Sequence, residues 1–480
     1  MKIITSLHTI CLMLSQTLSR RSAAAAVASP SPDFSTNSIV LDRSKCVACG
    51  MCIKACNSVA GQGVLKLVKV GNKKLVSTKS GKPLQETNCI KCGQCTLVCG
   101  PGALTQKDAI QTVSEVLKNP GDKVLVCQTA PAIRVNLADG LGMPAGSIIT
   151  GKMVTALKML GFKYVFDTNF GADLTIVEEA TELVNRIKDS KNGPLPMFTS
   201  CCPAWVNYVE QSQPDIIPNL STCRSPVGML SNVLKGEFPK LLNVDETKIY
   251  NVAIMPCTAK KDEAERPQLR TEKGTKETDA VITTRELVKM IKDAKIDFKN
   301  LPDTPFDKLY SEASGGGAIF CNTGGVMEAA IRSAYRFYTG KELKDYNILD
   351  VRGLDGIKLA SVDFDGTPIK FSVAQGVANA MKLIKKIKNH EDDVKDVKFV
   401  EVMACPGGCV CGGGSTRAKT KKVMEKRIEA AYKIDENSKS RVSHINTELN
   451  ECYDRYLDGK YFSHKAHHNF HTHLTPREIH

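Results

Sequence analysis

Eight cysteines near the amino terminus stand in two copies of one spacing, and this pattern constrains the fold more than any other feature of the chain. Each copy has three cysteines at intervals of three residues and a fourth cysteine four residues later. The copies are Cys46, Cys49, Cys52 and Cys56, and then Cys89, Cys92, Cys95 and Cys99. Thiolates at this spacing hold cubane iron–sulfur clusters. Zinc also binds Cys-x-x-Cys pairs, but it does not require the additional thiols of each copy.

The two copies predict an α+β domain of the bacterial ferredoxin type over residues 39–110, with two 4Fe–4S clusters. In such domains the fourth cysteine of each run ligates the other cluster. We therefore assign Cys46, Cys49, Cys52 and Cys99 to one cluster, and Cys89, Cys92, Cys95 and Cys56 to the other. A segment of this size buries little apolar surface, so its clusters must help to hold it together. Such clusters also require a reducing compartment that is poor in oxygen.

The first part of the chain has the composition of a targeting leader. Residues 1–38 contain Lys2, Arg20 and Arg21, many small and hydroxylated residues, and no acidic residue before Asp33. This composition favours an organelle presequence that is disordered. A secretory signal and an uncleaved leader are the alternatives. No apolar run in the sequence reaches the roughly 18 residues of a transmembrane helix, so none is predicted.

The net charge of +14 comes from 65 basic and 51 acidic residues. The charges are scattered and the chain has a single tryptophan, Trp205, so a surface on which nucleic-acid bases could stack is not evident. We therefore expect no nucleic-acid partner. A basic surface near a redox domain is better suited to an acidic protein partner, such as a small ferredoxin.

From about residue 120 the sequence alternates short apolar strands with helical patterns. Runs rich in β-branched residues predict strands at 124–131, 164–168, 197–200, 249–256, 279–284 and 398–404, and helical patterns occupy 173–189 and 285–295. This alternation predicts a two-lobed α/β domain with mostly parallel sheets over residues 111–463. The His-rich residues 464–480 are expected to form a packed or solvated tail rather than a metal site.

Three of the predicted strands run directly into cysteine. Cys201 and Cys202 follow the strand at 197–200, Cys257 follows the strand at 249–256, and Cys405 and Cys409 follow the strand at 398–404. Open α/β sheets place their sites at the carboxyl ends of parallel strands, so these thiols are expected to converge. Four soft thiolates select an iron–sulfur cluster.

The segments around these cysteines resemble the signatures of the iron-only (FeFe) hydrogenases. The matching segments are TSCCPAW (199–205), MPCTAKKDE (255–263), TGGVMEAAIR (323–332) and EVMACPGGCVCGGG (401–414). The resemblance covers about residues 39–460, and it is greatest to the hydrogenosomal hydrogenases of trichomonad-type protists. It implies an H-cluster, which is a 4Fe–4S cubane joined through one cysteine sulfur to a two-iron centre with CO, cyanide and a bridging dithiolate.

The resemblance implies roles for residues at the matching positions. The cubane ligands of the H-cluster would be Cys202, Cys257, Cys405 and Cys409, with Cys409 shared with the two-iron centre. Cys201 would deliver protons, and Lys260 would meet a cyanide. The pocket of the two-iron centre would be lined by Pro131, Ala132, Met255, Gly317, Phe320 and Met403.

A proton path is implied as well. Glu179 and Glu182 are three residues apart in a predicted helix and therefore share a face, and the Ser221 hydroxyl can both donate and accept. Arg186 stands one turn beyond Glu182. Two helical glutamates alone would more often form a solvated face, and only the resemblance favours a relay. The sequence departs from the family pattern at Asn57, Gly100, Val227, Cys321 and Cys411.

The sequence therefore predicts a ferredoxin hydrogenase that reversibly reduces protons to dihydrogen. Ferredoxin would supply electrons through two 4Fe–4S clusters, and hydrogenase maturation enzymes would supply the H-cluster. The leader favours the matrix of a hydrogenosome or another anaerobic mitochondrion-related organelle, with the cytoplasm as the alternative. The alternative function is a hydrogenase-like iron–sulfur cluster assembly factor without hydrogen chemistry. Such relatives lack the Cys201 position and end in tryptophan, whereas this chain ends in Ile479 and His480.

Overall fold

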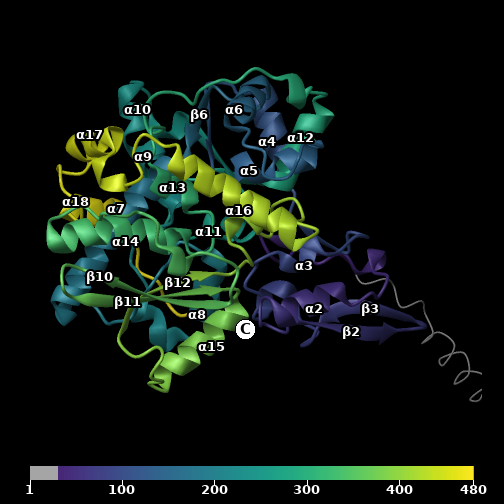
Figure 1. Cartoon of the computed structure of the whole chain (residues 1–480). Coiled ribbons are helices and arrows are strands. Elements are labelled where there is room, and N and C mark those ends of the chain that lie inside the picture. Colours follow the sequence, from purple (N-terminus) through teal and green to yellow (C-terminus); the bar gives the residue numbers. More distant parts are fainter. Residues whose placement is uncertain (1–30, 479–480) are drawn as a thin grey trace, which may run out of the picture.

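The structure is a computed structural model that describes residues 31–478. Figure 1 shows a small amino-terminal unit, coloured purple and dark blue, that lies against a larger body of helices and sheets. Most of the predicted leader falls on residues 1–30, which lie outside the described residues. Between residues 31 and 478, no helix combines the length and the apolar composition that a membrane span requires.

The first sheet of the body is entirely parallel. Its strands lie in the order β6 (Tyr164–Asp167), β5 (Val124–Thr129), β8 (Ile249–Met255) and β9 (Ala280–Thr283). Helices α6 (Thr150–Met159) and α12 (Thr284–Asp293) add apolar side chains to the core cluster around these strands. Each strand matches one that the sequence predicted, because parallel strands covered on both faces read as continuous apolar runs.

The second sheet is mixed. Its strands lie in the order β10 (Ile357–Asp363), β11 (Pro368–Gln375), β12 (Val397–Met403) and β7 (Met197–Phe198). β12 is parallel to β11 and to β7, whereas β10 pairs with β11 in the antiparallel sense. This hairpin was not predicted, because the edge strand β10 is half exposed and lacks a continuous apolar run. The prediction of mostly parallel sheets in an α/β body is confirmed.

A long helix, α7 (Thr168–Lys188), follows β6 and lies in the interior of the body. Asp167 caps its amino terminus by accepting a hydrogen bond from the Asn169 amide. The helix packs against α9 (Pro226–Gly236), α13 (Gly315–Ile319) and α14 (Gly325–Thr339). Because neighbours surround α7, Glu179 and Glu182 are buried and do not form a solvated face.

The amino-terminal unit contains two antiparallel strand pairs and two short helices. β1 (Ile39–Leu41) pairs with β4 (Leu104–Gln106), β2 (Leu65–Val70) pairs with β3 (Lys73–Thr78), and the cysteine runs extend into α2 (Met51–Ser58) and α3 (Gln94–Leu97). Asp33, which we assigned to the leader, exchanges backbone hydrogen bonds of 2.8 and 3.1 Å with Leu41. The last residues of the predicted leader are therefore part of the amino-terminal unit. Backbone pairing of this kind cannot be predicted from amino-acid composition.

The carboxyl-terminal segment is folded onto the body. It comprises α16 (Lys421–Glu436), α17 (Thr447–Tyr456) and α18 (His464–Phe470), and α18 buries Ala466 and Phe470 in a core cluster. The structure therefore gives no boundary at residue 464, because two apolar residues anchor a helix that is otherwise rich in histidine. Further helices are α4 (Ile110–Lys118), α5 (Ile133–Asn136), α8 (Pro203–Ser212), α10 (Phe238–Leu241), α11 (Ala259–Glu263) and α15 (Val377–Lys388).

Candidate active site

A cavity lies at the carboxyl ends of strands from both sheets. Cys202 follows β7, Cys257 follows β8, and Cys405 and Cys409 follow β12; all four residues line the cavity. The strand-end thiols therefore converge, as expected for a site at the carboxyl edge of parallel strands.

The four thiols are close enough to influence one another. Burial raises the pKa of Cys405, and the neighbouring Cys257 and Cys202 raise it further. Burial also raises the pKa of Cys409, and the other three cysteines add to that rise. Thiolates held this close repel one another unless a cation lies between them. Four soft sulfur donors around one buried space fit an iron–sulfur cubane.

Two glycines shape the loop between Cys405 and Cys409. Gly407 and Gly408 have φ angles of +75° and +92°, a region that side chains with a Cβ rarely adopt. A Cβ at Gly408 would also lie 2.6 Å from the carbonyl oxygen of Cys321. The two glycines therefore let the chain reverse tightly enough for both thiols to reach the same cavity.

Most of the predicted pocket residues line this cavity. They are Pro131, Ala132, Met255, Phe320 and Met403. Gly317 is not among the lining residues: a Cβ there would lie 2.6 Å from the Asn169 carbonyl oxygen, so this glycine allows α13 to approach α7. The lining also includes Val227 and Cys321, two positions at which the sequence departs from the family pattern.

Cys201 and Lys260 lie in the cavity wall beside the ligand positions. The Lys260 ammonium group donates to the Cys201 carbonyl oxygen over 3.2 Å and forms an ion pair of 2.6 Å with Glu263. We expected a cyanide to be the partner of this cation. Glu263 was not predicted as a partner, although its i, i+3 spacing from Lys260 in α11 is a signal for such a pair. Burial raises the pKa of Cys201 well above its usual value, and the nearby Glu179 adds to the rise.

The candidate proton-path residues lie together in the interior. Ser221 Oγ donates to Glu182 Oε2 over 2.9 Å, and Arg186 Nη2 donates to Glu182 Oε1 over 2.6 Å. Neither carboxyl oxygen of Glu179 has a hydrogen-bond partner among the residues that the structure describes. Burial raises the pKa of Glu179 to about 8, the proximity of Glu182 raises it as well, and the nearby Ser221 hydroxyl offsets part of the rise. A carboxyl group that titrates near neutral pH is suited to proton transfer.

The cysteines of the amino-terminal unit approach one another across the two runs. Burial raises the pKa of Cys52 to about 11. Among the neighbouring cysteines, Cys99 from the other run adds most to this rise. Burial also raises the pKa of Cys89 to about 11, and Cys56 from the first run adds to it. Backbone amides donate to two of the sulfurs, from Val76 to Cys46 over 3.2 Å and from Leu104 to Cys99 over 3.3 Å. This arrangement fits the exchange of the fourth cysteine between two clusters.

The second cysteine run reaches the cavity itself. Cys92 lines the cavity together with the strand-end cysteines. Gly413 permits this approach, since a Cβ there would overlap the carbonyl oxygen of Cys92. The preceding residue, Lys91, forms a buried ion pair of 2.7 Å with Asp262 in α11. These contacts join residues far apart in the sequence, so no local pattern could predict that the two thiol-rich sites are adjacent.

Comparisons with known proteins agree with this geometry. Residues 123–413 match the iron-only hydrogenase large subunit, C-terminal domain, and residues 421–477 match the iron hydrogenase small subunit. Iron hydrogenase 1 of Clostridium pasteurianum is 43% identical over 92% of this chain and 76% of its own length. A cytosolic Fe–S cluster assembly factor of Danio rerio is 30% identical over 70% of this chain and 82% of its own length.

A solved structure of a variant [FeFe]-hydrogenase from Chlamydomonas reinhardtii is similar in fold as well as in sequence. Its TM-score is 0.68 at 38% identity, and the match covers 76% of this chain and 98% of that chain. The family match spans more than half of the sequence and includes every strand-end cysteine at the cavity. The chain therefore belongs to the iron-only hydrogenase family.

Proposed function

We propose that this protein is a hydrogenase that reversibly reduces two protons with two electrons to dihydrogen. The observation that carries the proposal is the convergence of four thiols on one apolar cavity beside Cys201 and the unpartnered Glu179. The thiols that would hold the cubane of the H-cluster are Cys202, Cys257, Cys405 and Cys409. When bound, the two-iron centre with its CO, cyanide and dithiolate supplies the chemistry that makes and breaks the H–H bond.

The residues of the chain would bring protons to the cavity and keep water out of it. Cys201 is the thiol at the cavity wall that is not assigned as a cluster ligand, and Glu179 is close enough to raise its pKa. Ser221 and Glu182, already joined by a hydrogen bond, would continue the path away from the cavity. Each of these groups can accept one proton and release another, which a relay requires. Met255, Phe320 and Met403 supply an apolar wall that strengthens interactions of the Lys260 cation.

Electrons would enter through the amino-terminal unit and its two proposed 4Fe–4S clusters. Cys49 is exposed, and beside it Val47 is 66% and Met51 is 43% exposed. The charged side chains in residues 31–106 are mostly basic: Arg43, Lys45, Lys54, Lys66, Lys69, Lys73, Lys74, Lys79, Lys82 and Lys91, against Asp33, Asp42 and Glu86. An apolar patch among cations at the exposed cluster site suits an acidic ferredoxin as electron partner.

The type of hydrogenase and its compartment follow from the sequence signatures and the leader. Within the family, the chain is of the type found in the hydrogenosomes of trichomonad-like protists, and it works in such an organelle after maturation enzymes have supplied the two-iron centre. Fusion of residues 1–38 to a fluorescent reporter tests the compartment. Import into the organelle is expected, and a reporter that stays in the cytoplasm would contradict the assignment.

The second candidate function is an iron–sulfur cluster assembly factor, which the Danio rerio relative represents. A carrier of intact clusters has no use for a titratable thiol at the cavity wall with a buried carboxyl group, that of Glu179, close enough to raise the pKa of this thiol. The test is hydrogen evolution from reduced methyl viologen by the matured protein, with infrared spectra of the same sample. We expect dihydrogen together with bands of CO and cyanide. A protein with neither, and with iron for the two amino-terminal cubanes alone, would be a carrier.

A further inference from the structure

The proton path described above ends inside the protein. Glu182 is 3% exposed, and its Oε1 accepts a hydrogen bond of 2.6 Å from Arg186. Arg186 is equally buried, and its guanidinium group also donates to the carbonyl oxygens of Pro194, Pro218 and Leu220. A guanidinium group does not release its protons in proteins, so Arg186 cannot be the next member of a relay. Protons at Glu182 need another way to reach water.

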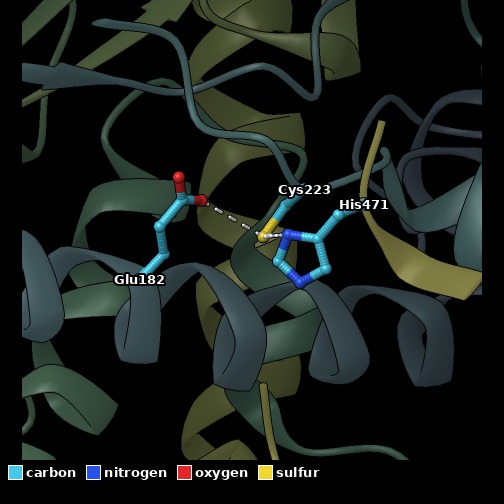
Figure 2. Close-up of side chains that lie close together, drawn as sticks. All are labelled: Glu182, Cys223 and His471. Carbon is cyan, nitrogen blue, oxygen red and sulfur yellow. Dashed lines mark hydrogen bonds between the residues drawn. The ribbon is translucent and has the colours of Figure 1, made fainter. Parts of the chain in front are cut away.

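Figure 2 shows a thiol and an imidazole beside Glu182. The sulfur of Cys223 lies 3.7 Å from Glu182 Oε2 and 3.9 Å from His471 Nδ1. All three side chains are buried. Burial raises the pKa of Cys223 well above its usual value, and among the charged neighbours Glu182 adds most to this rise. Cys223 is therefore held as a neutral thiol, which can donate a proton to one neighbour while it accepts one from the other.

The imidazole of His471 is held in an orientation suited to this contact. Its Nε2 lies 3.0 Å from Glu178 Oε2, and Glu178 also accepts hydrogen bonds from the Phe462 amide and the Tyr453 hydroxyl. Since Glu178 is an acceptor at each of these contacts, Nε2 is the nitrogen that carries the hydrogen. Nδ1 then faces Cys223 and lies 2.7 Å from the hydroxyl of Thr222.

Two further imidazoles lead from His471 toward the surface. The ring of His467 stacks on that of His471, with centroids 4.6 Å apart and planes 3° apart. The ring of His473 lies 6.3 Å from that of His467. Exposure rises along this series, because His471 is buried, His467 is half-buried and His473 is exposed.

We propose that Cys223 and His471 carry protons between Glu182 and the surface beside His467 and His473. In the inward step, the half-buried Thr222 hydroxyl, 2.7 Å from Nδ1, gives its proton to Nδ1 of neutral His471 and regains one from water. The Nδ1–H bond of protonated His471 then breaks as an S–H bond forms at Cys223. The original S–H bond breaks as an O–H bond forms at Glu182, so that one proton moves and no electrons are exchanged. This inference rests on the proposed function, because it extends the path that begins at Cys201.

The same three atoms are also a donor set for zinc. The separations of 3.7 and 3.9 Å are near the edges of a zinc tetrahedron, which are about 3.5 Å for bonds of about 2.0 and 2.3 Å. The relay is favoured because two of the three atoms already have hydrogen-bond partners outside the cluster: Glu182 Oε2 accepts from the Ser221 hydroxyl, and His471 Nδ1 lies 2.7 Å from the Thr222 hydroxyl. Elemental analysis separates the two: one zinc per wild-type chain that is lost from His471→Gln would overturn the relay.

The main test compares His471→Gln with the control His468→Gln in fully matured protein. Glutamine can keep the hydrogen bond to Glu178 but cannot pass a proton. We expect His471→Gln to lower hydrogen evolution and uptake by about tenfold or more with unchanged infrared bands, and His468→Gln to match wild type. If wild type evolves dihydrogen and His471→Gln equals it, the relay is wrong and the proposed function stands. If wild type itself evolves none, the proposed function fails first.

Two further measurements do not depend on the folding of His471→Gln. Cys223→Ser should retain most turnover, because a hydroxyl also donates and accepts, whereas Cys223→Ala should lose as much as His471→Gln. Equal turnover in the serine and alanine variants would overturn the relay. The other measurement is ¹⁵N nuclear magnetic resonance of histidine-labelled wild-type protein prepared without the two-iron centre. It should show the hydrogen of neutral His471 on Nε2, and a ring with the hydrogen on Nδ1 could not accept a proton from Cys223.

Discussion

Lys91 and Asp262 form a buried ion pair of 2.7 Å that joins the second cysteine run to the helix following Cys257. Burial acts to raise the pKa of Asp262, but the charge and hydrogen bond of Lys91, together with Arg477 and Arg266, leave it below its usual value. The pair fixes the cysteine run against the cavity. Loss of the pair should therefore weaken the junction, which is the contact between this cysteine run and α11.

Asp262→Asn is expected to destabilise the junction by about 3–5 kcal/mol, because it leaves the buried Lys91 cation without its partner charge. The measurement is the denaturant midpoint of wild type and variant at neutral pH. The control is Asp245→Asn, which removes the partner of Lys273 at the surface and should leave the midpoint near that of wild type. Equal shifts of the midpoint in the two variants would show that the buried pair contributes no more to stability than the surface pair.

The contribution of this pair should also depend on pH. Because the pKa of Asp262 is lowered from 3.8 in the folded chain, its stabilisation is present above that value and is lost as the pH falls through the folded pKa. The stability difference between wild type and Asp262→Asn should therefore shrink in acid. A difference that stayed constant from neutral pH into strong acid would contradict the pairing.

Cys201→Ala is expected to abolish most hydrogen evolution while leaving cluster content intact. A proton relay typically contributes about 10²- to 10⁴-fold, and ligation is assigned to the neighbouring Cys202. Iron analysis and infrared spectra should match those of wild type. Cys202→Ala is the matched comparison, because it should lose the cubane itself. Loss of iron from the Cys201 variant instead would reverse the two assignments.

Glu179→Gln is expected to lower turnover in both directions and to raise stability at alkaline pH. The pKa of Glu179 rises from 4.5 to about 8 on folding, so between these values the folded chain binds more protons than the unfolded chain. Its stability therefore falls as the pH rises through this range. Glutamine avoids this loss, which should be on the order of a few kcal/mol at alkaline pH and absent in acid. Unfolding midpoints that differ equally at all pH values would contradict the raised pKa.

A double variant tests whether Glu179 and Glu182 act in series. Glu179→Gln combined with Glu182→Gln should be barely slower than the slower single variant, since residues that act as one unit are not additive. Hydrogen evolution and uptake are measured on all three variants and on wild type. Losses that simply multiply would indicate parallel paths.

Turnover driven by reduced ferredoxin is expected to fall as salt rises, because ions screen the attraction between the basic unit and an acidic partner. Turnover driven by methyl viologen should change much less. Lys54→Glu, close to the exposed Cys49, should slow the ferredoxin reaction, and Lys439→Glu on the carboxyl-terminal segment is the control. The same salt dependence for both donors would argue against an acidic protein partner.

Much of the fold could be predicted from the sequence, because its signals are local. The strands β5, β6, β8 and β12 are continuous apolar runs, and three of the predicted strands end at cysteines that do converge on one cavity. The half-exposed β10 gave a weaker signal and was missed. Gly317 was assigned to the pocket because it matches a family motif, but it does not line the cavity. It lies where α13 packs closely against α7.

The sequence by itself determined the kinds of ligand and their spacing within each run, because a few bonds of local chain set the distance between neighbouring thiols. Only the tertiary structure decided what surrounds them. It buries Glu179 without a partner, pairs Lys91 with Asp262, and brings His471 next to Glu182. These relationships join residues that are distant along the chain. Burial and proximity set their charge states, and both exist only after the chain has folded.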